Sequence, residues 1–433
     1  MTAPVRVLRI AAGGEGVGTL ADGRTVFIPR AAPGDLLTLT DVELRKRFAR
    51  ARIDRILEAS TDRVTPRCIH YERDRCGGCQ LQHLTPDAQR VAKSVIVGDQ
   101  LRRIGHLDAI DPAVTPSDAE WRYRNKLTLT IEGGRIGLHR MDGSSRVFAL
   151  ERCEIAAPAL QELWAVLRAS RQALPAHAER LVLRVDREGG RHLIVECGAG
   201  AIWDGGGVLG RELAGRGVPA TIWWRPEGGA ARVVFGSDDA YPATVFEQVN
   251  PALGDLIRRY AVDQAGVAEG ERAWDLYAGI GETTELLLER GALVESVELD
   301  RRAVEQGMRR SRFGPPPGSQ APSGPVERHA GRVETLVGRL RRPDVVVTNP
   351  PRVGMDAAAV AAIAAARPRR IVYVSCDPAT LARDVARLGN DFVVTSVRAF
   401  DLFPQTAHVE TVLVLEAVKS GQVPVGFEVV SAG

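Results

Sequence analysis

Cys376 stands where a strand is expected to turn into a helix. Residues 371–374 form an unbroken apolar run, which is typical of a strand buried on both faces, and Asp377 followed by Pro378 is typical of a helix start. In open α/β sheets ligands bind at this carboxyl edge, and a helix N-terminus supplies positive potential that lowers the pKa of a thiol. The position therefore suits a nucleophile. A small buried cysteine that fills space is the alternative interpretation.

A carboxylate is expected close to this thiol. Residues 409–415 are predicted to form the last strand of a sheet, antiparallel to its neighbours, with Glu410 near its start. Because an antiparallel strand begins at the edge where its parallel neighbours end, Glu410 is predicted to lie near Cys376. The alternative is an ordinary solvated carboxylate at a strand start.

A second group of cysteines has metal-binding spacing. Cys68, Cys76 and Cys79 lie within twelve residues, with two glycines between the last two, and Cys153 offers a fourth thiol. Such thiols can converge on one metal centre, and the glycines let the backbone approach it closely. Four thiolates fit either an iron–sulfur cube or a tetrahedral zinc ion, and the spacing alone does not choose between them.

A glycine turn followed by an acidic strand end indicates a nucleoside site. A predicted strand ends at Tyr277, Gly279 and Gly281 follow before a helix, and about twenty residues further on a second strand ends in Glu298. A carboxylate there can accept both hydroxyls of a ribose. Because the third glycine of the dinucleotide fingerprint is missing, S-adenosylmethionine fits this turn better than NAD.

The 433 residues allow two or three domains, each with its own core. Frequent turns in the first part predict a small barrel of the oligonucleotide-binding type, followed by a mixed α/β region. Alternating strands and helices then predict a doubly wound sheet. The expected domains are residues 1–60, 61–262 and 263–433, with a disordered surface loop at 310–324.

Positive charge is concentrated at the front of the chain. Residues 1–106 carry 18 Lys and Arg against 12 Asp and Glu, which predicts a polyanionic partner. Residues 45–52 and 121–126 interleave cations with aromatic side chains, a composition suited to stacking on bases and pairing with phosphates. We find no apolar run of membrane-spanning length and no signal-peptide layout, so a cytoplasmic location is expected. In that reducing compartment the six cysteines are not expected to form structural disulfides, so metal binding or catalysis is the question for any clustered group. Cys197 lies in an apolar strand and is expected to belong to the core.

Taken together, these motifs resemble the RNA uracil-C5 methyltransferases. The closest branch resembles the 23S ribosomal RNA enzymes that carry a TRAM domain and an iron–sulfur cluster. The likeness runs from about Val5 to Leu415. Its motifs are Cys68…Cys76-Gly77-Gly78-Cys79…Cys153, Phe246-x-Gln248-Val249-Asn250, Asp275-Leu276-Tyr277, Asn349-Pro350-Pro351-Arg352, Ser375-Cys376-x-Pro378-Ala379-Thr380-Leu381-Ala382-Arg383-Asp384 and His408-Val409-Glu410.

The resemblance implies a multidomain α/β protein with an N-terminal OB-like TRAM barrel, a central α/β domain with the iron–sulfur site, and a seven-stranded Rossmann-like methyltransferase domain. It implies a [4Fe-4S] cluster held by Cys68, Cys76, Cys79 and Cys153. Cys376 would be the nucleophile and Glu410 the base. Gln248, Tyr277, Glu298 and Asn349 would hold S-adenosylmethionine, together with Gly279 of the glycine turn.

The chemistry explains these residue types. C5 of uracil is a poor nucleophile, so a thiolate must first add to C6 to produce an enolate whose C5 can attack the sulfonium methyl. A base must then remove the hydrogen from C5 so that the thiolate can leave. The target base must also be flipped out of its stack.

Several positions depart from the family pattern. Asp377 stands where Asn is expected, Asn349 replaces an Asp and Ala278 a Cys, and Glu282 and Arg332 occupy cofactor-loop positions that normally hold other residues. A carboxylate at 377 would raise the pKa of Cys376 and oppose the effect of the helix end.

The expected partner is structured RNA, ribosomal RNA first and transfer RNA second, bound by a monomer. Asn349-Pro350-Pro351 also raises amino methylation of a base, but Arg352 follows where such sites usually carry an aromatic residue. A non-catalytic RNA-binding or assembly factor is the alternative from a different class.

Overall fold

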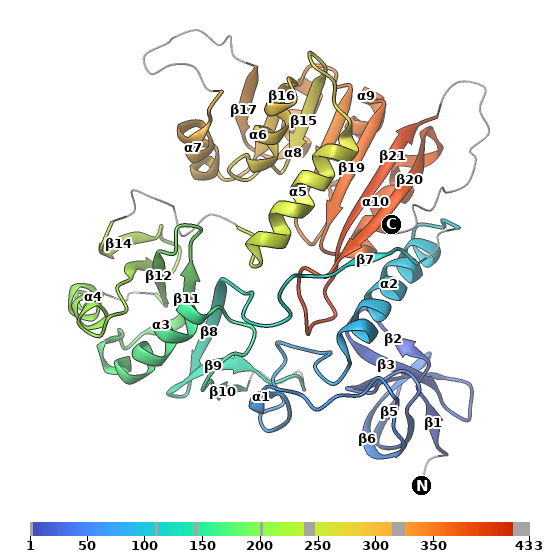
Figure 1. Ribbon diagram of the computed structural model, residues 1–433, viewed down its shortest axis with the longest axis vertical. Helices are drawn as coiled ribbons and strands as arrows, with labels where there is room; N and C mark the ends of the chain where they lie inside the picture. Colours follow the sequence, from blue (N-terminus) through green and yellow to red (C-terminus); the bar gives the residue numbers. More distant parts are fainter. Residues whose placement is uncertain are drawn as a thin grey trace.

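The computed structural model describes residues 3–108, 111–142, 146–199, 202–237, 247–313 and 325–418. The described strands form three sheets, of six, seven and eight strands (Figure 1). Most of the loop expected at 310–324 lies outside the described residues. Among the described helices, none combines the length and the apolar character that crossing a bilayer would require.

The first sheet closes on itself. Its strands are β1 (Val5–Arg6), β2 (Arg9–Ile10), β3 (Glu15–Thr19), β4 (Thr25–Pro29), β5 (Leu36–Leu44) and β6 (Phe48–Glu58), in the order β1-β5-β6-β4-β3-β2. Because β1 pairs with β5 while β2, only two residues further on, pairs with β3, one short segment joins both edges. The interior is aliphatic, with Val26, Ile28 and Leu37 fully buried.

The second sheet carries two helices. Its strands are β8 (Lys126–Glu132), β9 (Arg135–His139), β10 (Val147–Ala149), β11 (Ala178–Val185), β12 (Arg191–Cys197), β13 (Thr221–Pro226) and β14 (Arg232–Phe235), and its helices are α3 (Pro158–Ala169) and α4 (Gly206–Gly215). Leu181, Leu183 and Val195 alternate toward one face, where they share a core with Trp164 of α3 and Leu209 of α4. Cys197 is buried in the same core, as the sequence predicted.

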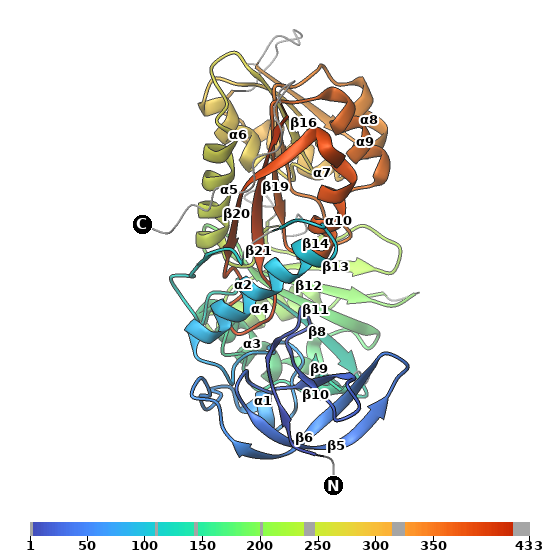
Figure 2. The ribbon, with the colours of Figure 1, turned by 90° about the vertical axis from the view of Figure 1, so that its right-hand side faces the viewer.

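The third sheet has the strand order β17-β16-β15-β18-β19-β21-β20-β7. Its later elements are α5 (Pro251–Ala265), β15 (Arg272–Leu276), α6 (Glu282–Glu289), β16 (Leu293–Glu298), α7 (Arg301–Arg310), β17 (Val326–Ala330), α8 (Val333–Leu336), β18 (Val345–Thr348), α9 (Ala357–Ala366), β19 (Arg370–Ser375), α10 (Pro378–Leu388), β20 (Phe392–Phe400) and β21 (Glu410–Ala417). The strands from β17 to β19 are parallel, and β21 is antiparallel to both neighbours. Helices α5 and α6 cover one face, and α8, α9 and α10 the other (Figure 2).

Part of the middle region joins this third sheet. The resemblance implied seven strands, and the eighth is β7 (Val114–Thr115), which pairs in parallel with β20. Helix α2 (Pro86–Arg103) buries Val97 and Leu101 in the core that holds Leu381 of α10. The chain therefore crosses from the short helix α1 (Ile69–Glu72) to the third sheet and back before β8 begins.

Candidate active site

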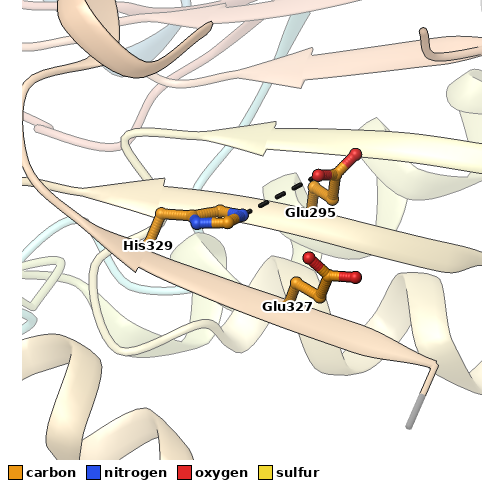
Figure 3. A group of neighbouring side chains, drawn as sticks. All are labelled: Glu295, Glu327 and His329. Atoms are coloured by element: carbon orange, nitrogen blue, oxygen red, sulfur yellow. Dashed lines mark ion pairs between the residues drawn. The ribbon is translucent and has the colours of Figure 1, made fainter. Parts of the chain in front are cut away.

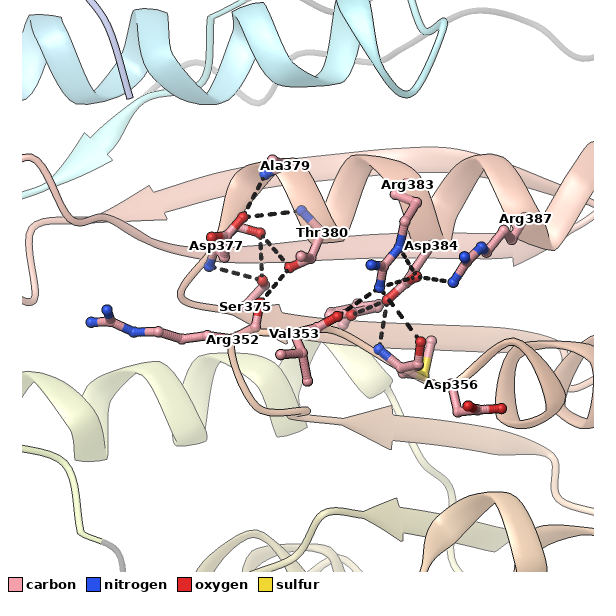
Figure 4. A network of polar contacts seen from close by, with 12 residues as sticks. Arg352, Val353, Asp356, Ser375, Asp377, Ala379, Thr380, Arg383, Asp384 and Arg387 are labelled. Atoms are coloured by element: carbon pink, nitrogen blue, oxygen red, sulfur yellow. Dashed lines mark hydrogen bonds and ion pairs between the residues drawn. The ribbon is translucent and has the colours of Figure 1, made fainter. Parts of the chain in front are cut away.

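Cys376 lies between β19 and α10, partly exposed, as the sequence predicted for a strand-to-helix turn. Asp377 is the N-cap of α10, and its carboxylate accepts hydrogen bonds from the amides of Ala379, at 2.9 Å, and Thr380, at 3.0 Å (Figure 4). The apolar strand and the Asp-Pro helix start thus place the thiol at the carboxyl edge of the sheet.

The thiol does not gain the acidity expected from a helix N-terminus. Burial, followed by the nearby Glu410 carboxylate, raises the pKa of Cys376 to about 11, while Arg352 lowers it and Asp377 raises it. The expected lowering of the pKa is wrong for the described structure, because burial and the Glu410 carboxylate outweigh the opposing effect of Arg352. The predicted opposing effect of Asp377 is confirmed in direction.

Glu410 is the first residue of β21 and lies next to Cys376. The last pair between β19 and β21 joins Ser375 to Thr411, so Glu410 lies one residue beyond it. The side chain is 1% exposed, and its Oε2 has no hydrogen-bond partner among the described residues. Burial raises the pKa of Glu410 to about 8, with Arg352 acting in the opposite direction. Such a buried, unpaired carboxyl is suited to proton transfer near neutral pH.

Arg352 is an exposed cation beside both groups. Its backbone carbonyl accepts a hydrogen bond from the Thr380 hydroxyl at 3.2 Å, which joins the loop after β18 to the start of α10 (Figure 4). The guanidinium lowers the pKa of both Cys376 and Glu410. Because the side chain is exposed, it could meet a phosphate or a carbonyl oxygen of a ligand at this edge.

The predicted cofactor residues gather at the same edge. Tyr277 follows β15 with a φ of 62°, and the Gly279 amide donates to the Glu298 carboxylate at 2.9 Å. The Asn349 backbone amide donates to the Leu276 carbonyl at 3.2 Å, which places Asn349 at the end of β18. Four of the five residues thus lie at the carboxyl ends of β15, β16 and β18. The fifth, Gln248, precedes α5.

A network of ion pairs that the sequence did not reveal joins the second sheet to the start of α6, directly after the glycine turn. Arg187 pairs with Glu282 at the start of α6 at 2.7 Å and with Glu247 at 2.9 Å, while Arg258 reaches Glu282 at 3.1 Å. The buried Arg184 also pairs with Glu247, at 2.6 Å. Glu282, unusual for the family position, is therefore explained by two arginines. Its partners are distant in sequence, so no local pattern could have revealed them.

Replacing Arg187 with methionine is expected to raise the Kd for S-adenosylmethionine about tenfold, a free-energy loss of about 1.4 kcal/mol. The substitution removes a cation shared by Glu247, which precedes Gln248, and Glu282 in the glycine turn. Calorimetry measures the affinity. Arg191→Met is the matched control, since Arg191 on the same hairpin pairs with Glu162 of α3, away from the turn. Equal affinities for both variants would contradict the expected role.

Four cysteines surround one cavity. Cys68, Cys76, Cys79 and Cys153 all line a space of 280 Å³, which Arg352 and His408 also reach. The Gly78 amide donates to the Cys76 sulfur at 3.4 Å, the kind of contact that stabilises thiolate ligands. All six cysteines are free thiols. The donor set and the cavity fit a thiolate-bound metal group.

Another group of potential ligands lies on β16 and β17. Glu295, Glu327 and His329 have ligand atoms within 4.8 Å of one another (Figure 3). The Arg341 amide donates to Glu295 at 2.9 Å and its guanidinium pairs with Glu327 at 2.9 Å. Because both carboxylates are already engaged by Arg341, this group is explained as an ion cluster at the sheet edge.

The strand order, the antiparallel β21 and the glycine turn after β15 define a class I, S-adenosylmethionine-dependent methyltransferase. A family described as tRNA (uracil-5-)-methyltransferase matches residues 327–418. An RNA methyltransferase of Streptomyces avermitilis is 31% identical over 96% of this chain and 98% of its own, and one of Halalkalibacterium halodurans is 32% identical over 91% and 93%. The chain belongs to the RNA uracil-C5 methyltransferase family.

A solved structure supports the fold. The tRNA (uracil-54, C5)-methyltransferase of Pyrococcus abyssi, in complex with S-adenosyl-L-homocysteine, superposes with a TM-score of 0.70 at 23% identity. The match covers 96% of this chain and 100% of the other. The match therefore supports the fold over nearly the whole length of this chain.

Proposed function

We propose that this enzyme methylates C5 of one uridine in structured ribosomal RNA, through a covalent bond between Cys376 and C6 of the base. The observation that carries the proposal is the pairing of a partly exposed thiol with Glu410, a buried carboxyl whose Oε2 has no partner among the described residues. Both lie at the edge where the predicted cofactor residues gather.

Each residue has a defined step. The Cys376 thiolate adds to C6, and the electron pair of the C5–C6 bond makes C5 a nucleophile. S-adenosylmethionine supplies an electrophilic methyl group, which C5 attacks as S-adenosylhomocysteine leaves. Glu410 then takes the proton from C5, the double bond re-forms, and the C6–S bond breaks to return the thiolate. One thiol and one carboxylate therefore suffice for the cycle.

The front of the chain is proposed to bind the RNA, as a TRAM domain. Arg50 and Arg52 lie on β6 of the closed sheet, and both side chains are at least half exposed. Beyond this sheet, the Arg67 guanidinium lies 5.4 Å from the Trp121 ring, a cation–π pair suited to a neighbouring base. These surfaces would track the phosphates around the target uridine.

The four cysteines are proposed to hold a [4Fe-4S] cluster. A tetrahedral zinc ion would need sulfurs about 3.8 Å apart, given Zn–S bonds of about 2.3 Å. Among the described residues, only Glu295, Glu327 and His329 form a group of three or more potential ligands whose ligand atoms all lie within 4.8 Å of one another. No three of the four cysteine sulfurs are therefore that close to one another. Sulfurs spaced more widely than around zinc favour an iron–sulfur cluster. Bound by all four cysteines, the cluster would link the segment around Cys68 to the segment around Cys153.

The purified protein is expected to be brown, with broad absorption near 400 nm and about four iron atoms per chain. Cys79→Ser should lose the colour and most of the iron, because it removes a buried ligand. Cys197→Ser is the matched control, since Cys197 is a buried cysteine that is not among the described residues lining the cavity, and the variant should keep the iron. Stoichiometric zinc in colourless protein would favour the zinc alternative.

The rate of methylation is expected to rise with pH between 6 and 9. Glu410, with its pKa raised to about 8, and Cys376, with its pKa raised to about 11, must both lose a proton to act. Single-turnover rates at subsaturating RNA measure the profile. Asp377→Asn should raise the rate at pH 7, because it removes a negative charge near the thiol while keeping a capping side chain. A rate that falls above pH 7 would contradict this assignment.

Mapping 5-methyluridine in total RNA, from cells with and without this chain, tests the substrate. Loss of one 5-methyluridine in ribosomal RNA is the expected result. Loss in transfer RNA instead would match the substrate named for the Pyrococcus abyssi enzyme. No loss in either, together with tight RNA binding and no S-adenosylmethionine binding, would support the non-catalytic assembly factor.

A further inference from the structure

The segment between β20 and β21, here called the 401–409 loop, leads directly into Glu410. On the side of β19, strand pairing stops at Thr411, so backbone pairing with that strand does not reach Glu410. The carboxylate Oε2 has no partner among the described residues. On its other side Glu410 pairs with Phe400 of β20, the residue just before the loop. The position of Glu410 relative to Cys376 therefore depends on how β20 and this loop are held.

The loop is held by side chains from far earlier in the chain. The Tyr123 hydroxyl donates to the Pro404 carbonyl at 3.0 Å, and the Asn250 amide donates to the Leu402 carbonyl at 3.4 Å. Gln80, next to Cys79, accepts from the Ala407 amide at 3.3 Å. These contacts surround the loop with parts of the middle region.

Gln89 on α2 makes the most extensive contact. Its Oε1 accepts from the Gln405 backbone amide at 2.8 Å, and its Nε2 donates to the Gln405 side-chain oxygen at 3.0 Å and to the Leu84 carbonyl at 3.0 Å. Gln89 is 2% exposed, and Gln405 has a φ of 72°. A buried amide with three partners holds this left-handed turn in one conformation, because every unmade bond would leave a polar group unsatisfied.

Lys93, one helical turn later on α2, holds the start of the loop. Its ammonium pairs with the Asp401 carboxylate and donates to the Phe403 carbonyl at 3.0 Å, and the side chain is fully buried. A buried ion pair is a costly way to gain stability, since desolvation offsets much of the attraction. It does fix geometry, because the loop cannot move away without leaving both charges buried and unpaired.

We propose that Gln89 and Lys93 are positioning residues for Glu410. They act through the 401–409 loop and touch no reacting atom. The inference rests on the proposed function, in which Glu410 removes the proton from C5. Their loss should therefore slow hydrogen removal and leave the earlier addition of Cys376 to C6 intact.

Gln89→Leu tests this, because it keeps the side-chain size and removes all three hydrogen bonds. With unmodified uridine RNA, the variant should accumulate the methylated covalent adduct, and release of tritium from C5 should slow at least tenfold. Its adduct with 5-fluorouridine RNA should form at the wild-type rate. Gln89→Glu should recover part of the release rate, because a carboxylate can still accept from the Gln405 amide.

Gln161→Leu is the matched control. Gln161 lies on α3, and its amide donates to the Ala156 carbonyl at 3.3 Å, away from the loop. It should release tritium at the wild-type rate. If Gln89→Leu fails to fold, the double variant Lys93→Met with Asp401→Leu replaces the ion pair by apolar groups and should give the same accumulation of adduct.

Glu410→Gln distinguishes the proposed function from the positioning role. If Glu410→Gln accumulates the adduct while folded Gln89→Leu, or the double variant, turns over like wild type, the positioning role is wrong and the proposed function stands. If Glu410→Gln itself turns over normally, the role of the base is wrong. Uniformly slower addition and release in Gln89→Leu would indicate a general structural role and overturn the inference.

Discussion

Cys376→Ala should lower the methylation rate by about 10⁴-fold or more and abolish the covalent adduct with 5-fluorouridine RNA, because without the thiolate C5 of uracil stays a poor nucleophile. The loss is expected in full because the four thiols that line the cavity reached by Arg352 are proposed to hold the cluster and so cannot replace Cys376. Denaturing gel electrophoresis detects the adduct, and incorporation of labelled methyl groups measures the rate.

Cys197→Ala is the control for this substitution. Cys197 is 4% exposed in the core of the second sheet and should keep both the adduct and the rate. Full activity in folded Cys376→Ala protein would remove the basis of the C5 mechanism. It would favour methylation of an exocyclic amino group near Asn349 instead.

Glu410→Gln should let the adduct form and then hold it, with hydrogen removal slowed by about 10²–10⁴-fold. A glutamine keeps the size of the buried side chain but cannot take the proton from C5, so the C6–S bond cannot break. With ordinary uridine RNA and S-adenosylmethionine, a methylated covalent complex should appear on denaturing gels, whereas the wild-type complex should be short-lived.

Glu416→Gln is the matched control on the same strand. Glu416 pairs with Arg370 at the other end of β21, far along the strand from the thiol, and should leave turnover unchanged. Wild-type release of hydrogen from C5 in Glu410→Gln protein would show that another group is the base. Loss of adduct formation would instead assign Glu410 to the first step.

The sequence anticipated the local features of the site well. The apolar run before Cys376, the Asp377-Pro378 helix start and the glycine turn after β15 each lie within a few residues, and the structure has them as expected. The antiparallel direction of the last strand is also confirmed. The assignment of roles to Cys376 and Glu410, the cluster and the three domain boundaries remain predictions.

Long-range features could not be anticipated. Gln89 and Lys93 are polar residues on the buried face of α2. Their partners are 316 and 308 residues away. The pKa of Cys376 was misjudged for the same reason. It is raised mainly by burial and by the Glu410 carboxylate, and both exist only once the strands have packed together.

The sequence alone determined the helices and strands and the residue types at their ends. Strand patterns, helix caps and glycine turns depend only on residues that are neighbours in the sequence. What only the tertiary structure decided is which of these ends meet, how deeply Glu410 is buried, and that α2 and β7 join the third sheet. Burial and contact between distant segments are properties of the packed chain, and they set the pKa values and the geometry on which the chemistry depends.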